Sequence, residues 1–185
     1  ASGLSQDVET DDSVLRQTSA RLPWLLIGML GGIGNSMILG NFDTTFAAHP
    51  EMALYIPLIG GTGGNVGTQS SALVVQGLAN SSLDANNTWK QILKESVVAL
   101  INATIISMLV YIYNFVRFGP TATVSYSVSL SLFAVVMFAS IFGTLVPMTL
   151  EKLKIDPAIA TGPFISITND IIGMMLYMGI TVLLS

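Results

Sequence analysis

Residues 57–71 read PLIGGTGGNVGTQSS, and no other part of the chain limits the possible folds as strongly. Five glycines fall within eight consecutive residues, and a Thr-Gln-Ser-Ser run follows them. Each glycine costs a helix about 1 kcal/mol relative to alanine, so the stretch is a poor isolated helix. Small residues four apart, such as Gly60 and Gly64, allow close helix packing in a membrane. Packing does not explain Asn65 and Gln69, which would share one helix face and suit a hydrated cation.

The residues on both sides of this stretch are strongly apolar. Of the 185 residues, 51% are hydrophobic and only 10% are charged, and the mean hydropathy is +0.69. A soluble domain carries about 25% charged residues, so this composition indicates a membrane protein. The chain has no cysteine, which excludes disulfides, cysteine zinc sites and thiol catalysis. A net charge of −4 provides no basic patch for nucleic acid.

Five segments are long and apolar enough to cross a bilayer, which requires about 20 residues. Charged or turn-forming residues separate them. Long apolar runs are typical of helices, whereas a transmembrane barrel shows short alternating segments. The sequence therefore predicts an all-α integral membrane protein with five transmembrane helices, at about residues 23–48, 53–79, 92–116, 124–150 and 157–184.

The distribution of Lys and Arg predicts the orientation in the membrane. Six of the seven basic residues precede the first span or lie in the two loops on the same side, and only Arg117 lies on the other. Because cytoplasmic loops are enriched in Lys and Arg, we expect a cytoplasmic N-terminus and an outside C-terminus in the plasma (inner) membrane. Five helices form a thin wall for a pathway, so a homodimer with the pore at its subunit interface is expected.

Asp170 is the one acidic residue that lies deep within a predicted membrane span. The other ten acids lie in the N-terminal tail, in loops or near span ends, whereas Asp170 lies 13 residues after Pro157 and 15 before Ser185. This places it near the midplane, where a charge costs about 3 kcal/mol. Either the carboxyl is neutral and hydrogen-bonded, or it faces water and cations in a pathway, which is the usual role of intramembrane acids.

Polar and small residues before Asp170 favour the pathway. Ser166 and Pro163 precede it by four and seven residues, so a helix places all three on one face. Within a helix Pro163 would remove a backbone hydrogen bond and free a carbonyl, and the alternative is a kinked packing helix. The expected metal ligand is Asp170. The expected pore-lining residues are Gly61, Gly64, Asn65, Thr68, Gln69, Gly162, Ser166 and Asn169.

Three motifs resemble those of the MgtE magnesium channels. The first is the pattern Pro-x-x-x-Gly-x-Gly-Gly-Asn-x-Gly-x-Gln in residues 57–69. The others are Arg-Leu-Pro-Trp in residues 21–24, and Asp-Pro-Ala at 156–158 leading to Asn-Asp-Ile-Ile-Gly at 169–173. The resemblance covers residues 21–184.

This resemblance implies five helices per protomer, a homodimer, and a midplane aspartate that holds a largely hydrated Mg²⁺. Asp170 occupies that position, and residues 21–185 would form the pore domain. Family members usually also carry an acidic helical domain and paired CBS domains, cytoplasmic regulatory parts that we expect to be missing here. Residues 1–20 would then be a cytoplasmic tail, the remnant of the connecting helix. Gly162 departs from the family, because a polar pore-lining residue is expected at its position.

Mg²⁺ dehydrates reluctantly and prefers oxygen ligands through retained waters, which suits one carboxylate among amides and hydroxyls. The leading hypothesis is a Mg²⁺-selective channel that imports hydrated ions, with Mn²⁺, Co²⁺ and Ca²⁺ as further candidates, and not an enzyme. The alternative is a proton- or sodium-coupled carrier. An intramembrane aspartic protease needs two carboxylates that share a proton, and only one buried acid is expected per chain. A membrane anchor leaves the cost of Asp170 unexplained.

Overall fold

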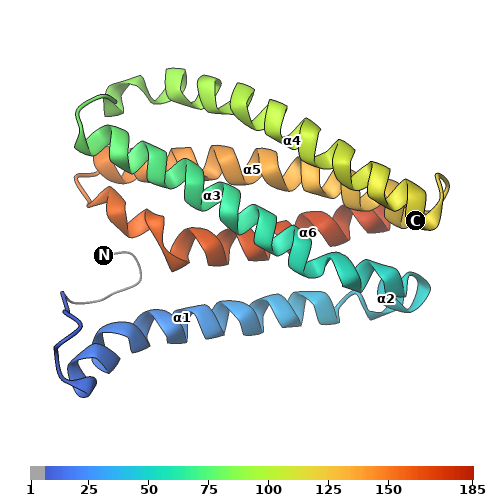
Figure 1. The fold of residues 1–185 in the computed structure, drawn as a ribbon, viewed down its shortest axis with the longest axis horizontal. Helices are drawn as coiled ribbons and strands as arrows, with labels where there is room; N and C mark the ends of the chain where they lie inside the picture. Colours follow the sequence, from blue (N-terminus) through green and yellow to red (C-terminus); the bar gives the residue numbers. More distant parts are fainter. Residues whose placement is uncertain (1–6) are drawn as a thin grey trace.

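The computed structural model describes residues 7–185, apart from the side chains of 160 and 161, and this part is helical with no β-strand (Figure 1). Residues 1–6, where the expected tail begins, lie outside the described residues. The α-helices are α1 (Val14–Gly40), α2 (Asp43–Ala48), α3 (Ile56–Ala79), α4 (Thr88–Phe118), α5 (Thr123–Lys152) and α6 (Pro163–Leu184). Short 3₁₀ turns are η1 (Pro50–Tyr55), η2 (Ala85–Asn87) and η3 (Pro157–Thr161).

Four helices in the described part are long and apolar enough to cross a membrane. They are α1, α4 together with the turn before it, α5 and α6. The 24 residues of α3 would span about 36 Å, but its glycines and polar side chains lower its mean hydropathy. The prediction of an all-helical fold is confirmed for the described residues, and these four helices are candidate membrane spans. The count of five spans depends on α3 and stays a prediction.

The helix α5 lies at the centre of the bundle and packs against α3, α4 and α6, whereas α1 lies apart along α6 (Figure 1). The buried side of α5 carries five serines and four valines, together with Ala139 and Gly143. Small side chains allow neighbouring helices to approach closely in a membrane, where van der Waals contact replaces the hydrophobic effect as the driving force. The composition of α5 therefore explains its central position.

A close helix crossing joins α3 to α5 through two glycines. A Cβ atom built on Gly143 would lie 2.5 Å from the carbonyl oxygen of Gly67, a backbone atom that has no freedom to move aside. One turn away, a Cβ atom on Gly63 would lie 2.9 Å from Cγ1 of Val135. These glycines of α3 therefore serve helix packing, as the small-residue spacing suggests.

We expect Gly143→Ala to destabilise the protein by about 2 kcal/mol, because overpacking a close contact costs about 1–3 kcal/mol. The melting temperature in detergent measures the effect. Gly179→Ala in α6 is the matched control, since a Cβ atom there meets nothing within 4 Å. Its stability should be unchanged or higher. A Gly143→Ala protein as stable as the wild type would contradict this crossing.

Buried hydrogen bonds hold the segment that leads from α1 into α3. The hydroxyl of Tyr177 donates to the carbonyl oxygen of Met52 at 2.7 Å, and that of Tyr55 donates to Oδ1 of Asn114. The side-chain amide of Asn114 in turn donates to the carbonyl of Val124 at 3.5 Å. These bonds tie the start of α3 to α4, α5 and α6, and so they set the position of the glycine-rich face.

The predicted first span of residues 23–48 is wrong at its C-terminal end. The helix α1 begins at Val14, inside the expected tail, and ends at Gly40. Asn41 stops it, because its side-chain amide donates to the carbonyl of Met37 at 2.9 Å and caps the last turn. Residues 43–48 form the separate helix α2, and the predicted second span also starts later, after the turn η1. The predicted third and fourth spans lie within α4 and α5.

The prediction that Pro163 lies inside a helix is also wrong. Pro163 is the first residue of α6, where its missing N–H leaves no hydrogen bond unmade. The freed carbonyl that we expected from a mid-helix proline is therefore not needed. Asp170 lies seven residues along α6, about 10 Å from the start of that helix. The sequence count from Pro157 had placed it farther along.

Candidate functional site

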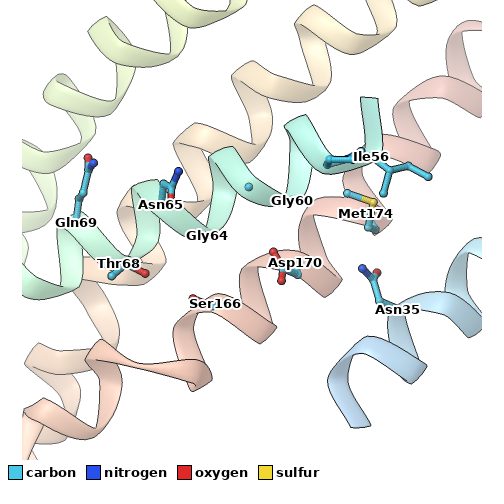
Figure 2. Close-up of a pocket in the computed structure, with 12 residues that line it drawn as sticks. Asn35, Ile56, Gly60, Gly64, Asn65, Thr68, Gln69, Ser166, Asp170 and Met174 are labelled. Carbon is cyan, nitrogen blue, oxygen red and sulfur yellow. The ribbon is translucent and has the colours of Figure 1, made fainter. Parts of the chain in front are cut away.

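A polar cavity of about 520 Å³ lies between α1, α3 and α6 (Figure 2). Among the described residues, Asp170 from α6 is the only charged one in the lining, and most of the polar groups come from α3. The complete lining consists of Asn35, Ile56, Pro57, Gly60, Gly61, Gly64, Asn65, Thr68, Gln69, Ser166, Asp170 and Met174. The cavity therefore has a negative field from one carboxylate and no basic side chain to offset it.

The carboxylate of Asp170 faces the glycine side of α3. A Cβ atom on Gly60 would lie 3.4 Å from Oδ1 of Asp170, and one on Gly64 would lie 3.7 Å from the same oxygen. Any larger side chain at these positions would therefore cover the carboxylate. The glycines leave the half-buried Asp170 side chain open to the cavity.

Helical spacing places the polar groups of α3 along this face. Thr68 follows Gly64 by four residues, and Gln69 follows Asn65 by four, so two parallel rows line the cavity. On α6, Ser166 lies one turn before Asp170 and also lines the cavity (Figure 2). The structure thus brings together seven of the nine residues that the sequence singled out: Gly61, Gly64, Asn65, Thr68, Gln69, Ser166 and Asp170.

The other two predicted residues, Gly162 and Asn169, do not line the cavity. Gly162 precedes the first turn of α6 as its N-cap. Asn169 is 1% exposed and packs against α3, where a Cβ atom on Gly67 would overlap its amide nitrogen. Consecutive residues of a helix point about 100° apart, so Asn169 faces the helix contact while Asp170 faces the cavity. The expectation that Gly162 and Asn169 line the pore stays a prediction.

The sequence reasoning missed Asn35, which reaches the cavity from α1. Its Oδ1 atom is buried and has no hydrogen-bond partner among the described residues. Polarity within the apolar run of α1 was the available signal. Ile56, Pro57 and Met174 also line the cavity, but nothing distinguishes them from other apolar side chains in the sequence.

A second buried acid, Glu95, overturns the expectation of one buried acid per chain. It is 9% exposed, and its Oε1 atom accepts a hydrogen bond from the Ser70 hydroxyl at 2.6 Å. The Ser70 hydroxyl oxygen lies 3.4 Å from that of Ser140. Because α4 begins at Thr88, Glu95 lies two turns inside that helix and faces α3 and α5. It does not line the Asp170 cavity.

The donor set of the cavity suits a cation that keeps its water. Among the described residues, no three His, Cys, Asp or Glu side chains lie close enough to enclose a metal ion. A bare Mg²⁺ requires six oxygens at about 2.0–2.1 Å. Six waters at about 30 Å³ each occupy about 180 Å³, well below the cavity volume. A hydrated ion therefore fits beside Asp170, with amide, hydroxyl and backbone oxygens available to its waters.

Comparisons with known proteins point to one family. A family model named MgtE, described as a divalent cation transporter, matches residues 56–180. The magnesium transporter MgtE of Bacillus subtilis (strain 168) is 32% identical over 175 residues, which cover 95% of this chain and 39% of that protein. Its namesake in Thermus thermophilus is 33% identical over 165 residues, covering 89% and 36%. The chain thus spans less than two-fifths of the length of these relatives.

Proposed function

Because the chain belongs to the MgtE family of divalent cation transporters, we propose that it conducts hydrated Mg²⁺ across a membrane through the Asp170 cavity. The observation that carries the proposal is the position of Asp170. No other described residue brings a charged side chain to this polar cavity, and Asp170 faces a row of glycines that leaves its oxygens open. The match to a family of transporters supports transport over enzyme catalysis.

The proposed mechanism relies on contacts to the hydration shell. A carboxylate attracts the divalent charge and accepts hydrogen bonds from the bound waters. The side-chain oxygens of Asn65, Thr68 and Gln69 accept further bonds, so the ion moves along α3 without losing its waters. Ions that shed water easily gain less from such a site, which favours Mg²⁺ over Ca²⁺. Mn²⁺ and Co²⁺ are further candidates.

We propose that a second copy of the chain completes the pore. Gly61, Asn65 and Gln69 line the cavity and are also exposed, so one chain leaves this side of the pathway open. A two-fold interface on this face would cover the opening and bring two Asp170 carboxylates to one ion. Their summed charge of −2 would neutralise the +2 charge of Mg²⁺.

Cysteine cross-linking tests this dimer, because the chain contains no cysteine of its own. We expect Asn65→Cys in membranes to form a covalent dimer, since residues near a two-fold axis face their own copies. Val97→Cys is the matched control, because that side chain is 59% exposed on α4, which does not line the cavity. Equal cross-linking of the two variants would contradict the proposed interface.

We further propose a location in the plasma (inner) membrane with the N-terminus cytoplasmic, as the Lys and Arg distribution predicts. Uptake by liposomes loaded with a Mg²⁺-sensitive dye tests the function. A channel should conduct in the absence of pH and sodium gradients. Flux that collapses when either gradient is removed would favour the coupled carrier, and no divalent flux under any gradient would refute both.

One observation favours the coupled carrier, and it is Glu95. This buried carboxylate accepts a serine hydrogen bond, and no described Lys or Arg forms an ion pair with it. Buried acids outside the main site are candidates for binding a coupling proton or sodium ion. For a channel, the same acid would only tie α4 to α3.

Substitution of Glu95 separates these two roles. For a channel, we expect Glu95→Gln to transport Mg²⁺ normally, because glutamine retains the Oε1 acceptor for Ser70. Glu95→Leu should lower stability by about 1–3 kcal/mol, because the buried serine hydroxyls lose their partner. Uptake and melting temperature are the measurements. Loss of gradient dependence in Glu95→Gln would instead favour the carrier.

A further inference from the structure

The two ends of the Asp170 cavity differ in polarity. Toward the C-terminal end of α3, the lining carries Asn65, Thr68 and Gln69. Toward the start of α3, the lining is apolar except for one amide, that of Asn35 from α1. Figure 2 shows Asn35 beside Met174, on the opposite side of Asp170 from Ser166. A hydrated ion that moves between Asp170 and this end therefore meets a single polar side chain.

The amide oxygen of Asn35 is not satisfied by any residue that the structure describes. Its Oδ1 atom is buried and accepts no hydrogen bond from the described residues. The other asparagine near the end of α1, Asn41, donates instead to its own helix at Met37. A buried polar group without a partner is costly and needs a compensating ligand or function.

Close packing of α1 on α6 holds Asn35 in this position. One turn earlier, a Cβ atom on Gly31 would overlap the side chain of Ile167. The two helices therefore touch at Gly31, and residue 35, one turn along on the same face, is carried towards the cavity. The neighbouring Ser36 is exposed and does not line the cavity.

We infer that Asn35 is a specificity-determining residue of the cation site, where its amide oxygen accepts a hydrogen bond from a water of the hydrated divalent ion at Asp170. This inference rests on the proposed function. The ion's own waters supply the donor that Oδ1 lacks. An ion that arrives partly dehydrated leaves Oδ1 unpaired, so Asn35 favours ions that keep their water.

The test compares Asn35→Leu, Asn35→Asp and the control Ser36→Ala in the reconstituted protein. Mg²⁺ affinity is measured by the ion-dependent rise in melting temperature and by the Mg²⁺ concentration for half-maximal uptake. We expect Asn35→Leu to weaken Mg²⁺ binding about tenfold, the equivalent of one hydrogen bond at a charged site, and to narrow the preference for Mg²⁺ over Ca²⁺. Asn35→Asp should bind Mg²⁺ more tightly, and Ser36→Ala should match the wild type.

Stability without Mg²⁺ separates this role from simple packing. Leucine removes the unpaired acceptor at similar volume, so the ion-free Asn35→Leu protein should melt at the wild-type temperature or above it. Unchanged Mg²⁺ affinity and selectivity in Asn35→Leu would overturn the inference. An ion-free Asn35→Leu protein that melts well below the wild type would also overturn it, because destabilisation alone would then explain the weaker binding. If Asp170→Asn still abolishes uptake, the proposed function stands. If Asn35→Leu and Asp170→Asn both behave like the wild type, the inference about Asn35 and the proposed function are both refuted.

Discussion

Replacement of Asp170 by asparagine is expected to abolish Mg²⁺ uptake while the protein remains folded. The two side chains have nearly the same size, so the packing against Gly60 and Gly64 is preserved. The change removes the one charge that the described residues contribute to the cavity lining. A unit charge pair at 4 Å is worth about 4 kcal/mol at an effective dielectric constant of 20. The expected loss of Mg²⁺ affinity is therefore roughly a thousandfold.

Dye-loaded liposomes measure the uptake of the Asp170→Asn protein, and gel filtration and the melting temperature show whether it is folded. Asp43→Asn, the same change in α2 outside the cavity, is the matched control and should transport normally. A half-buried charge without a basic partner is costly, so its loss should leave the ion-free melting temperature of Asp170→Asn unchanged or higher. Wild-type uptake in this variant would contradict the assignment of Asp170 as the ion site.

Closing the space above Asp170 is expected to reduce uptake almost as strongly. In Gly60→Val the Cβ atom would lie 3.4 Å from the carboxylate oxygen, and two further methyl groups would occupy the place of the ion's waters. An overlap with one ordered water costs a few kcal/mol, as overpacking does, so uptake should fall about a hundredfold. The fold should persist, because 3.4 Å is an ordinary contact and the backbone need not move.

Gly179→Val is the matched control for this prediction. Gly179 lies in α6, does not line the cavity, and a Cβ atom there meets nothing within 4 Å. The same loss of glycine should therefore leave uptake unchanged. Gly60→Ala should give an intermediate uptake. If Gly60→Val conducts like the wild type, the ion does not pass between α3 and Asp170.

The bounds of a helix could be predicted where hydropathy alone determines them. The apolar runs of α4 and α5 continue up to polar or turn-forming residues, so the predicted and observed spans overlap over their full predicted length. The ends of α1 and the start of α6 were not predictable in this way. Asn41 ends a helix through one side-chain hydrogen bond, and Pro163 begins one because it lacks an N–H. Capping is local geometry that an average over an apolar run does not register.

The candidate site shows the same division. The four-residue spacing in residues 57–71 places Asn65 and Gln69 on one helix face. The position of Asp170 within an apolar span identifies it as the candidate ion ligand. Neither pattern indicates which face of α6 meets α3, so the burial of Asn169 could not be predicted from the sequence. Glu95 was overlooked because its partner Ser70 is 25 residues away in sequence.

Composition and the spacing of residues within single helices were enough to establish the membrane class, the helical fold, the family resemblance and the acid at the centre of the candidate site. Which groups share the cavity became known only from the packing of the helices. Asn35 lies in the same cavity as Asp170 because Gly31 lets α1 pack closely on α6. Asn169 lies outside the cavity because its side chain packs against Gly67. Helices approach most closely where a glycine lies at the crossing. The position of each crossing is set by the packing of whole helices, so the sequence of a single helix does not reveal it.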